Sequence, residues 1–171
     1  MLRNIIVCTV ILIIFVLAST LEASASICPK HTVEQRSIVL KAYSAGSPQD
    51  LGYSLAAIVI KESFVGPYVV KVNNTDGKYG SYGLTHVNLE TAMWLEGYSN
   101  SWKAKQDLIP KLIHDDNYAF SVSLLKLLKH KSRGWEGMWS KYNGTGKKAK
   151  AYGKAVKSNV LMLMKCYSLG V

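Results

Sequence analysis

A glutamate at the end of an apolar segment is the first residue in this sequence suited to catalysis. Glu62 follows residues 56–61, Ala-Ala-Ile-Val-Ile-Lys, which we expect to lie in a buried helix. The C-terminal end of a helix dipole and apolar surroundings both disfavour an ionised carboxylate, so we expect the pKa of Glu62 to be raised. A carboxyl group that keeps its proton near neutral pH suits general acid catalysis. The simpler interpretation is a surface glutamate beside Lys61.

Two further segments combine glycines with polar side chains. Residues 80–88 read Gly-Ser-Tyr-Gly-Leu-Thr-His-Val-Asn, and such glycines allow a backbone to approach a ligand closely. Residues 140–146 read Ser-Lys-Tyr-Asn-Gly-Thr-Gly, which places Tyr142 and Asn143 before a glycine turn. Taken singly, the first segment is typical of a turn and the second of a helix C-cap. Neither identifies a site by itself.

Helices are the main elements that must position these segments. Residues 32–35, Thr-Val-Glu-Gln, form a capping-box pattern, so a helix is predicted from there to about Ala45. Ser47 as cap and Pro48 as first helical residue predict a second helix that ends near Ser63 or Phe64. Residues 65–87 change to β-branched residues and turn signals such as Asp76-Gly77, which predict a small strand pair or an irregular loop.

The rest of the sequence favours further helices. They are predicted over residues 88–97 with Asn88 as cap, 115–130, 135–142 and 148–167. In the second of these, Phe120, Leu124, Leu127 and Leu128 are expected to face inward. The tryptophans at helical spacing are attractive sugar-stacking platforms, but core positions are expected for them; they are Trp94, Trp102, Trp135 and Trp139. The predicted fold class is therefore mainly α (α+β), one domain with a small β-hairpin or loop element.

Composition and charge narrow the classes of protein. The chain has 171 residues, 49% of them hydrophobic, which is too many for a disordered protein. There is no collagen-like period, heptad pattern or obvious internal repeat. With 21 Lys+Arg against 11 Asp+Glu, the formal charge is +10. Such a protein is attracted to polyanions such as acidic wall polymers, anionic lipid or nucleic acid. Because its lysines are scattered, a soluble basic surface is an equally good interpretation.

The first 25 residues are typical of a secretory signal peptide. Arg3 precedes an apolar run over residues 5–18, and residues 23–25, Ala-Ser-Ala, suit signal peptidase. The run is shorter than the roughly 20 residues that span a bilayer; an uncleaved anchor is the alternative. We therefore expect a mature domain over 26–171, exported to the periplasm or cell envelope. Export argues against nucleic acid as a partner.

Cysteines and histidines give no sign of a metal site. Cys8 leaves with the signal peptide, and the two that remain, Cys28 and Cys166, lie near opposite ends of the mature chain. In an oxidising compartment this pair is expected to form a structural disulfide. A zinc site requires a second pair of Cys or His ligands, and no such pair lies near either cysteine. The four histidines also lack the spacing of metal ligands. No metal and no cofactor are expected.

In this order and spacing, the three polar segments resemble the lytic transglycosylase family of peptidoglycan-cleaving enzymes, which have a lysozyme-like fold. The family has a helix that ends in Glu-Ser, matched by Glu62-Ser63. Its Gly-Leu-Met-Gln segment, often followed by Ile-Asn, corresponds to residues 83–88, and its Ala-Tyr-Asn-Ala-Gly is matched in part by residues 141–146. The resemblance covers roughly residues 33–160. The compact length is closest to the small members that open the wall for secretion, pilus or conjugation machinery.

The resemblance implies a mechanism with one carboxyl group. Such enzymes cleave the β-1,4 bond between N-acetylmuramic acid and N-acetylglucosamine. Glu62 is expected to protonate the glycosidic oxygen and then to take the proton of the muramoyl C6 hydroxyl, which gives a 1,6-anhydro product without water. A second acid is not required, whereas ordinary glycosidases use two. Asp76 is the candidate second acid, and its participation would make a hydrolytic outcome possible.

The resemblance also assigns residues to substrate binding. Ser63 and the backbone of the glycine segment are expected to line the cleft, and Tyr142 to hydrogen-bond near Glu62 or the sugar with support from Asn143. Thr85-His86 replaces the family's Met-Gln, which predicts an altered sugar-subsite preference, and Gly144-Thr145 replaces Ala-Gly. The predicted binding residues are Ser63, Gly83, Leu84, His86, Tyr142 and Asn143.

Three other functions compete with a lytic transglycosylase. The first is a lysozyme-type hydrolase that cleaves the same bond with an activated water. The second is a non-catalytic glycan-binding envelope protein, which is the case if the Thr85-His86 change disables the cleft. The third, a membrane-active basic protein, is disfavoured because no segment after residue 25 is both strongly cationic and hydrophobic. The expected partners are peptidoglycan strands and a secretion, pilus or conjugation apparatus, and a monomer without a stable membrane anchor is expected.

Overall fold

A computed structural model describes residues 28–66, 69–71 and 80–167. The chain divides into two units, residues 1–30 and 31–171, and only residues 28–30 of the first are described. The predicted signal peptide therefore lies outside the described residues. Cys28 and Cys166 are both disulfide-bonded, and their predicted pairing is confirmed. No helix among the described residues is long and apolar enough to cross a membrane.

Two helices come first in the second unit. Helix α2, Val33–Gly46, has the predicted capping box: Thr32 accepts from the Gln35 amide, and the Gln35 side chain accepts from the Thr32 amide. The second predicted helix begins later than expected. Ser47–Gln49 form a short 3₁₀ turn, η1, and Asp50 then has a left-handed backbone that ends it. Helix α3, Gly52–Ser63, starts only after this break.

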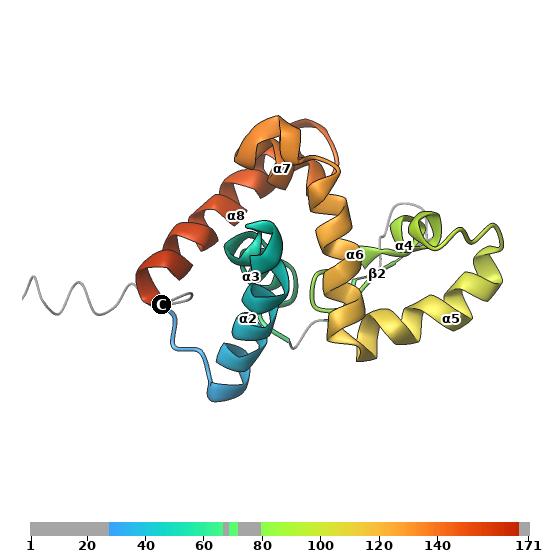
Figure 1. Ribbon diagram of the computed structural model, residues 1–171, viewed down its shortest axis with the longest axis horizontal. Helices are drawn as coiled ribbons and strands as arrows, with labels where there is room; N and C mark the ends of the chain where they lie inside the picture. Colours follow the sequence, from blue (N-terminus) through green and yellow to red (C-terminus); the bar gives the residue numbers. More distant parts are fainter. Residues whose placement is uncertain (1–27, 67–68, 72–79, 168–171) are drawn as a thin grey trace, which may run out of the picture. The chain divides into compact units, whose positions relative to one another are not determined.

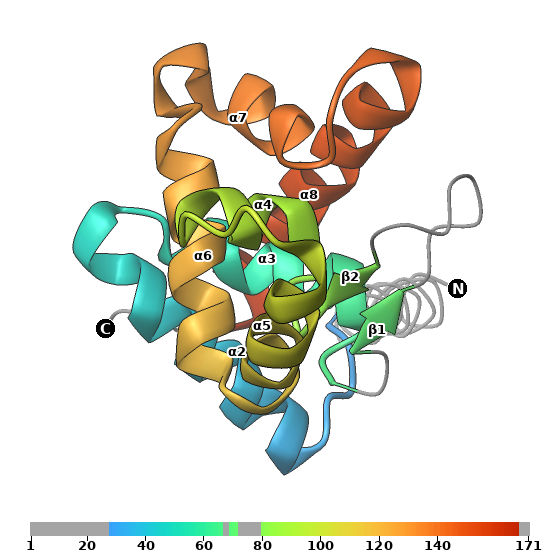
Figure 2. The ribbon, with the colours of Figure 1, turned by 90° about the vertical axis from the view of Figure 1, so that its right-hand side faces the viewer.

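A small antiparallel sheet follows α3. Its strands are β1, Val70–Lys71, β2, Ser81–Tyr82, and β3, Val87–Asn88, in the order β1-β2-β3. Figure 2 shows β1 and β2 side by side. Lys71 pairs with Ser81, and Tyr82 pairs with Val87. The predicted β element is thus confirmed as three very short strands. The expected turn at Asp76-Gly77 lies outside the described residues.

The middle of the chain contains one helix that the sequence analysis did not predict. Helix α4, Leu89–Leu95, begins after Asn88, whose side chain caps it as predicted. Helix α5, Ser101–His114, was not predicted, although Asn100 caps it and Ala104, Leu108 and Leu112 bury one face. Pro110 inside α5 obscured this pattern. Helix α6, Asp116–Leu128, is confirmed, with Asp115 as its cap.

Two helices complete the fold. After a short 3₁₀ turn, η2, Lys131–Arg133, helix α7, Gly134–Tyr142, agrees with its prediction. Helix α8, Gly146–Cys166, begins two residues before the predicted start. Helix α3 packs against α2 and against α8, and α7 packs against α8 (Figure 1). The described residues are therefore mainly α-helical with a small three-stranded sheet, as predicted for the fold class.

The apolar side chains form two clusters. The larger one surrounds α3, whose residues Leu55 and Ile58 are fully buried, and the smaller one joins α4, α5 and the start of α6. Phe120, Leu124 and Leu127 face inward as predicted, whereas Leu128 is 37% exposed, contrary to prediction. Among the tryptophans only Trp139 is buried. The core positions predicted for the other three are wrong, because they are at least half exposed: Trp94, Trp102 and Trp135.

Gly83 occupies a backbone position where any other residue would be strained and would clash. Its backbone is left-handed, with φ +77°, and a Cβ atom placed on it would lie 2.1 Å from the Leu112 carbonyl oxygen. We predict that Gly83→Ala lowers the free energy of unfolding by roughly 2–4 kcal/mol, because left-handed strain and a backbone clash add together. Urea denaturation measures this change.

Gly97 provides the matched control. It has a similar φ of +72°, but a Cβ atom there would meet nothing within 4 Å. Gly97→Ala should therefore cost only the left-handed strain, about 1 kcal/mol. Equal losses in the two variants would contradict the proposed clash at Gly83.

Candidate functional site

Glu62 and His86 form a buried pair of ionisable side chains. Glu62 lies in the last turn of α3, and His86 lies between β2 and β3. His86 Nδ1 is 3.0 Å from Glu62 Oε2, and the two side chains are only 6% and 8% exposed, respectively. Their residues lie 24 positions apart in the sequence, and both were predicted to belong to the site. The structure therefore places these two predicted residues in direct contact.

The contact reverses the expected direction of the Glu62 pKa. Burial by itself raises the pKa of this carboxyl group, as predicted. The hydrogen bond from His86, the nearby Tyr152 hydroxyl, and the positive charges of Lys71 and His86 together outweigh burial, so the pKa of Glu62 is lowered. The prediction of a raised pKa was wrong because it considered only the helix end and its apolar surroundings. Glu62 is thus an ionised carboxylate that accepts the Nδ1–H of His86.

The backbone around this pair is bent sharply. His86 has a left-handed φ of +47°, and Phe64 and Val65, just after α3, have φ values of +50° and +61°. Such conformations are costly for residues other than glycine, and they persist only where the surrounding structure holds them. The His86 amide donates to the Gly83 carbonyl at 3.0 Å, which closes the turn. The turn directs the imidazole of His86 back toward α3.

Buried hydroxyl groups hold the segment that carries His86. Tyr142 donates its phenolic proton to the Thr85 carbonyl at 2.9 Å, and its oxygen lies 3.0 Å from Ser123 Oγ. Ser123 Oγ also lies 2.6 Å from Thr85 Oγ1 and 2.8 Å from the Ala119 carbonyl. Thr85 replaces the methionine of the family pattern, and its hydroxyl belongs to this network. The network thus connects α6 and α7 to the residue directly before His86.

Tyr142 is predicted to hydrogen-bond near Glu62 or the sugar, and it lines the same pocket as Glu62. Its hydroxyl donates to the Thr85 carbonyl beside His86 and contacts Ser123, and no hydrogen bond to Glu62 itself is found among the described residues. Tyr152, on α8, lines the pocket beside Glu62 and contributes to the lowered pKa of that carboxyl group, and the Tyr142 and Tyr152 rings stack with centroids 6.2 Å apart. Tyr152 was not among the predicted site residues. Its signal was a tyrosine on the buried face of α8, since a buried hydroxyl needs a polar neighbour.

Three of the predicted cleft residues do not line the pockets around Glu62. Ser63 is fully buried, and its hydroxyl donates to the Val59 carbonyl at 3.0 Å. Leu84 is 6% exposed and belongs to the larger apolar cluster. The Gly83 amide donates to the Val69 carbonyl at 2.8 Å and so joins the segment to the chain before β1. These three residues are buried and have no surface toward the cleft. Their role is therefore to hold the backbone around the site and not to contact a ligand.

A cleft opens on the Glu62–His86 pair. It consists of two pockets, with volumes of about 730 and 380 Å³, that share Glu62, Lys71, His86 and Asn143. Asn143 lies in this cleft as predicted. The larger pocket extends along α8 past Tyr152, and the smaller one extends to Glu90 and Lys126. Five lysines line the two pockets, and none of them was predicted as a site residue: Lys61, Lys71, Lys126, Lys141 and Lys148.

The arrangement is suited to proton transfer and to binding anionic or polar ligands. A carboxylate and an imidazole at hydrogen-bond distance can exchange one proton between them, and the cleft gives a ligand access to both. Lysine side chains around the pair attract negative charge. Over the described ranges no three His, Cys, Asp or Glu residues are grouped so as to hold a metal ion. Asp76, the predicted second acid, lies outside the described residues.

The lowered pKa of Glu62 predicts how its contribution to stability depends on pH. Because the folded pKa lies below the usual 4.5, the carboxylate stabilises the fold above about pH 5, and this contribution disappears as the pH falls through the folded pKa. The difference in unfolding free energy between wild type and Glu62→Gln should therefore shrink from pH 5 to pH 2 in urea titrations. A difference that stays constant or grows on acidification would contradict the assignment.

His86→Asn is the control for this experiment, since asparagine tolerates a left-handed backbone but carries no charge. When Glu62→Gln is introduced into the His86→Asn variant, the resulting change in unfolding free energy should depend less on pH. The reason is that the imidazole hydrogen bond that lowers the pKa of Glu62 has been removed.

Comparison with known proteins identifies no relative. No family model, no curated protein sequence and no solved structure matches this chain.

Proposed function

We propose that this protein is a peptidoglycan lytic transglycosylase in which the Glu62–His86 pair carries the reacting proton. The single observation that supports the proposal best is an almost fully buried carboxyl group, hydrogen-bonded to an imidazole at 3.0 Å, at the edge of a basic cleft. The order of the three sequence segments around it gives the substrate class. Peptidoglycan is anionic, which suits a protein with a formal charge of +10.

The chemistry proceeds in two proton transfers. The proton on the His86–Glu62 hydrogen bond moves to Glu62 Oε2 and from there to the glycosidic oxygen, as the bond from that oxygen to the muramoyl C1 breaks. Charge develops on C1 and its ring oxygen. The carboxylate then accepts the proton of the muramoyl C6 hydroxyl while that oxygen bonds to C1. The products are a 1,6-anhydromuramoyl end and a free N-acetylglucosamine end, and the pair regains its proton.

The lowered pKa of Glu62 makes His86 a necessary part of this mechanism. A carboxylate that is ionised at neutral pH has no proton to donate by itself. The His86 imidazole, 3.0 Å from Glu62 Oε2, can pass a proton to the carboxylate without a large movement and can take one back after the second step. Tyr142 acts as a positioning residue, because it holds the Thr85 backbone next to His86.

The setting that we propose is the cell envelope. The signal-like first 25 residues and the Cys28–Cys166 disulfide favour export to an oxidising compartment. Peptidoglycan strands are the proposed partner, and opening the wall for a secretion, pilus or conjugation machine is the proposed task. The mechanism uses only side chains of this chain.

The test of the proposed function is the mass of the muropeptides released from purified peptidoglycan. Wild-type protein should release products one water lighter than hydrolysed ones. Glu62→Gln should reduce the rate about a thousandfold, because it removes the group that both donates and accepts the proton. Glu34→Gln, at an exposed position in α2, is the matched control and should retain activity. Full activity in Glu62→Gln would refute the mechanism, and binding without release would indicate a glycan-binding protein.

One observation favours a lysozyme-type hydrolase as the second candidate. Glu90, in the first turn of α4, lines the same pocket as Glu62, so a second carboxyl group is present at the cleft. In a hydrolase Glu90 would activate water or stabilise the charge on the sugar.

The variant Glu90→Gln separates the two candidates. A transglycosylase should change in rate by less than about tenfold, because its second step uses Glu62 again. In a hydrolase the same change should reduce the rate by a hundredfold or more, and the wild-type products should carry reducing ends. Rates and products are measured in one muropeptide digest.

A further inference from the structure

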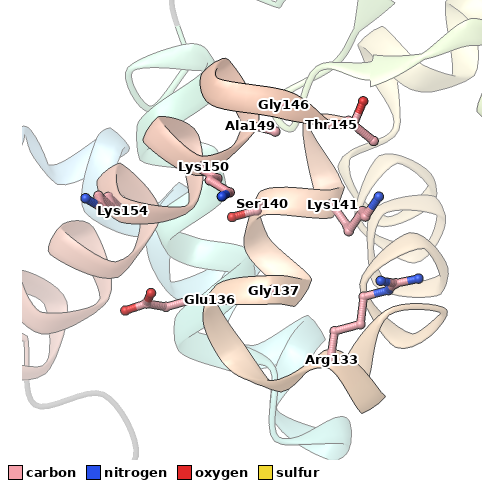
Figure 3. A pocket seen from close by; sticks show the side chains of 11 residues that line it. Arg133, Glu136, Gly137, Ser140, Lys141, Thr145, Gly146, Ala149, Lys150 and Lys154 are labelled. Carbon is pink, nitrogen blue, oxygen red and sulfur yellow. The ribbon is translucent and has the colours of Figure 1, made fainter.

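A basic pocket adjoins the cleft on the surface of α7 and the start of α8. Figure 3 shows the side chains that line it, and its volume is about 550 Å³. It shares Lys141 and Gly144 with the pocket that contains Glu62 and His86. The two pockets are therefore neighbours on one surface. When the main chain of a branched substrate is bound at Glu62, a side branch of that substrate can extend into the basic pocket.

The side chains of this pocket carry an excess of positive charge. Arg133, Lys141, Lys150 and Lys154 line it, together with one acid, Glu136. The Glu136 carboxylate is 2.5 Å from the Lys157 ammonium, so its charge is already compensated by a residue outside the pocket. Two of these cations also act on a neighbouring histidine: after burial, the charges of Arg133 and Lys141, with those of Lys129 and Lys126 outside the pocket, lower the pKa of His130.

The base of the pocket consists of small residues. Gly137, Ser140 and Ala149 form it, and a Cβ atom on Gly153 would lie 2.3 Å from Ser140 Oγ, so α7 and α8 are in close contact there. In Figure 3 the Lys154 and Glu136 side chains lie on one side of this base, and those of Lys141 and Arg133 lie on the other. Cationic ends thus surround a shallow space without bulky side chains.

We infer that this pocket binds carboxylates of the short peptide attached to the muramoyl sugar at or next to the cleavage site. The inference rests on the proposed function. The glycan backbone offers few charges, whereas the peptides of peptidoglycan carry several free carboxylates close to each muramoyl residue. Lysine and arginine side chains bind carboxylates through charge-assisted hydrogen bonds. Such a pocket makes the protein selective for strands that still carry their peptides.

Binding of a defined muropeptide tests the pocket separately from catalysis. The probe is N-acetylglucosaminyl-N-acetylmuramoyl-tripeptide, which lacks the bond that the proposed enzyme cleaves. Its comparison compound has the same peptide with the carboxylates converted to amides. Calorimetry with Lys150→Glu/Lys154→Glu should give affinity for the acidic probe about tenfold weaker than wild type. The amidated probe should bind both proteins equally and more weakly than the acidic one binds wild type.

The matched control variant changes the same charge elsewhere. Lys103→Glu/Lys105→Glu alters two exposed lysines of α5 that line none of the pockets described above, and it should bind like wild type. Equal weakening in both variants would overturn the inference, because it would indicate a general effect of net charge. Equal affinity for the acidic and amidated probes would also overturn the inference, and so would the absence of binding to either probe. Lysine-dependent binding of anionic lipid vesicles, without binding of the muropeptide, would overturn it as well.

The cleavage assay separates this inference from the proposed function. Lysine-dependent binding in a protein that releases no muropeptides would refute the lytic activity and support the pocket. Release of anhydro products by wild type, with muropeptide binding that is independent of Lys150 and Lys154, would refute only the pocket. If both hold, the lysine variant should also lose the wild-type preference for peptide-bearing strands over amidase-treated ones.

Discussion

The buried hydrogen bond between Glu62 and His86 is the interaction on which the rest of the site depends. A carboxylate that is only 8% exposed is costly unless a cation or strong donors compensate its charge. His86, Tyr152 and Lys71 provide that compensation from three different elements. Burial acts against all three, because it favours the neutral carboxyl group. The pair therefore joins the end of α3, the segment after β2 and the face of α8 into one electrostatic unit.

The scaffold behind this pair is organised to hold one strained residue. His86 takes a left-handed backbone, and the buried hydroxyls of Tyr142 and Ser123 hold the residue before it. Gly83 lets the same segment pass close to the Leu112 carbonyl. A histidine held in this way has little freedom to turn from Glu62. The cost of the strained backbone is offset by the packing of α6 and α7 around the segment.

The sequence predicted the helical elements well and the roles of side chains less well. Caps at Thr32 and Asn88 are local signals, so those helix starts were predictable, whereas Pro110 concealed α5. Glu62, His86 and Asn143 were found because they lie in recognisable segments. Tyr152, Lys71 and the true partner of Tyr142 were not, because each depends on a contact between distant elements. The predicted direction of the Glu62 pKa shift was wrong for the same reason, because His86 and Lys71 contact or approach Glu62 from other elements of the fold.

In the proposed mechanism the Glu62–His86 pair donates one proton in the first step and accepts another in the second, and water takes no part. Digestion of peptidoglycan in water enriched in oxygen-18, followed by mass spectrometry of the released muropeptides, shows whether water takes part. We expect anhydro products that contain no oxygen-18, formed by wild type and absent with Glu62→Gln. Products that carry the label at their newly formed reducing ends would contradict it.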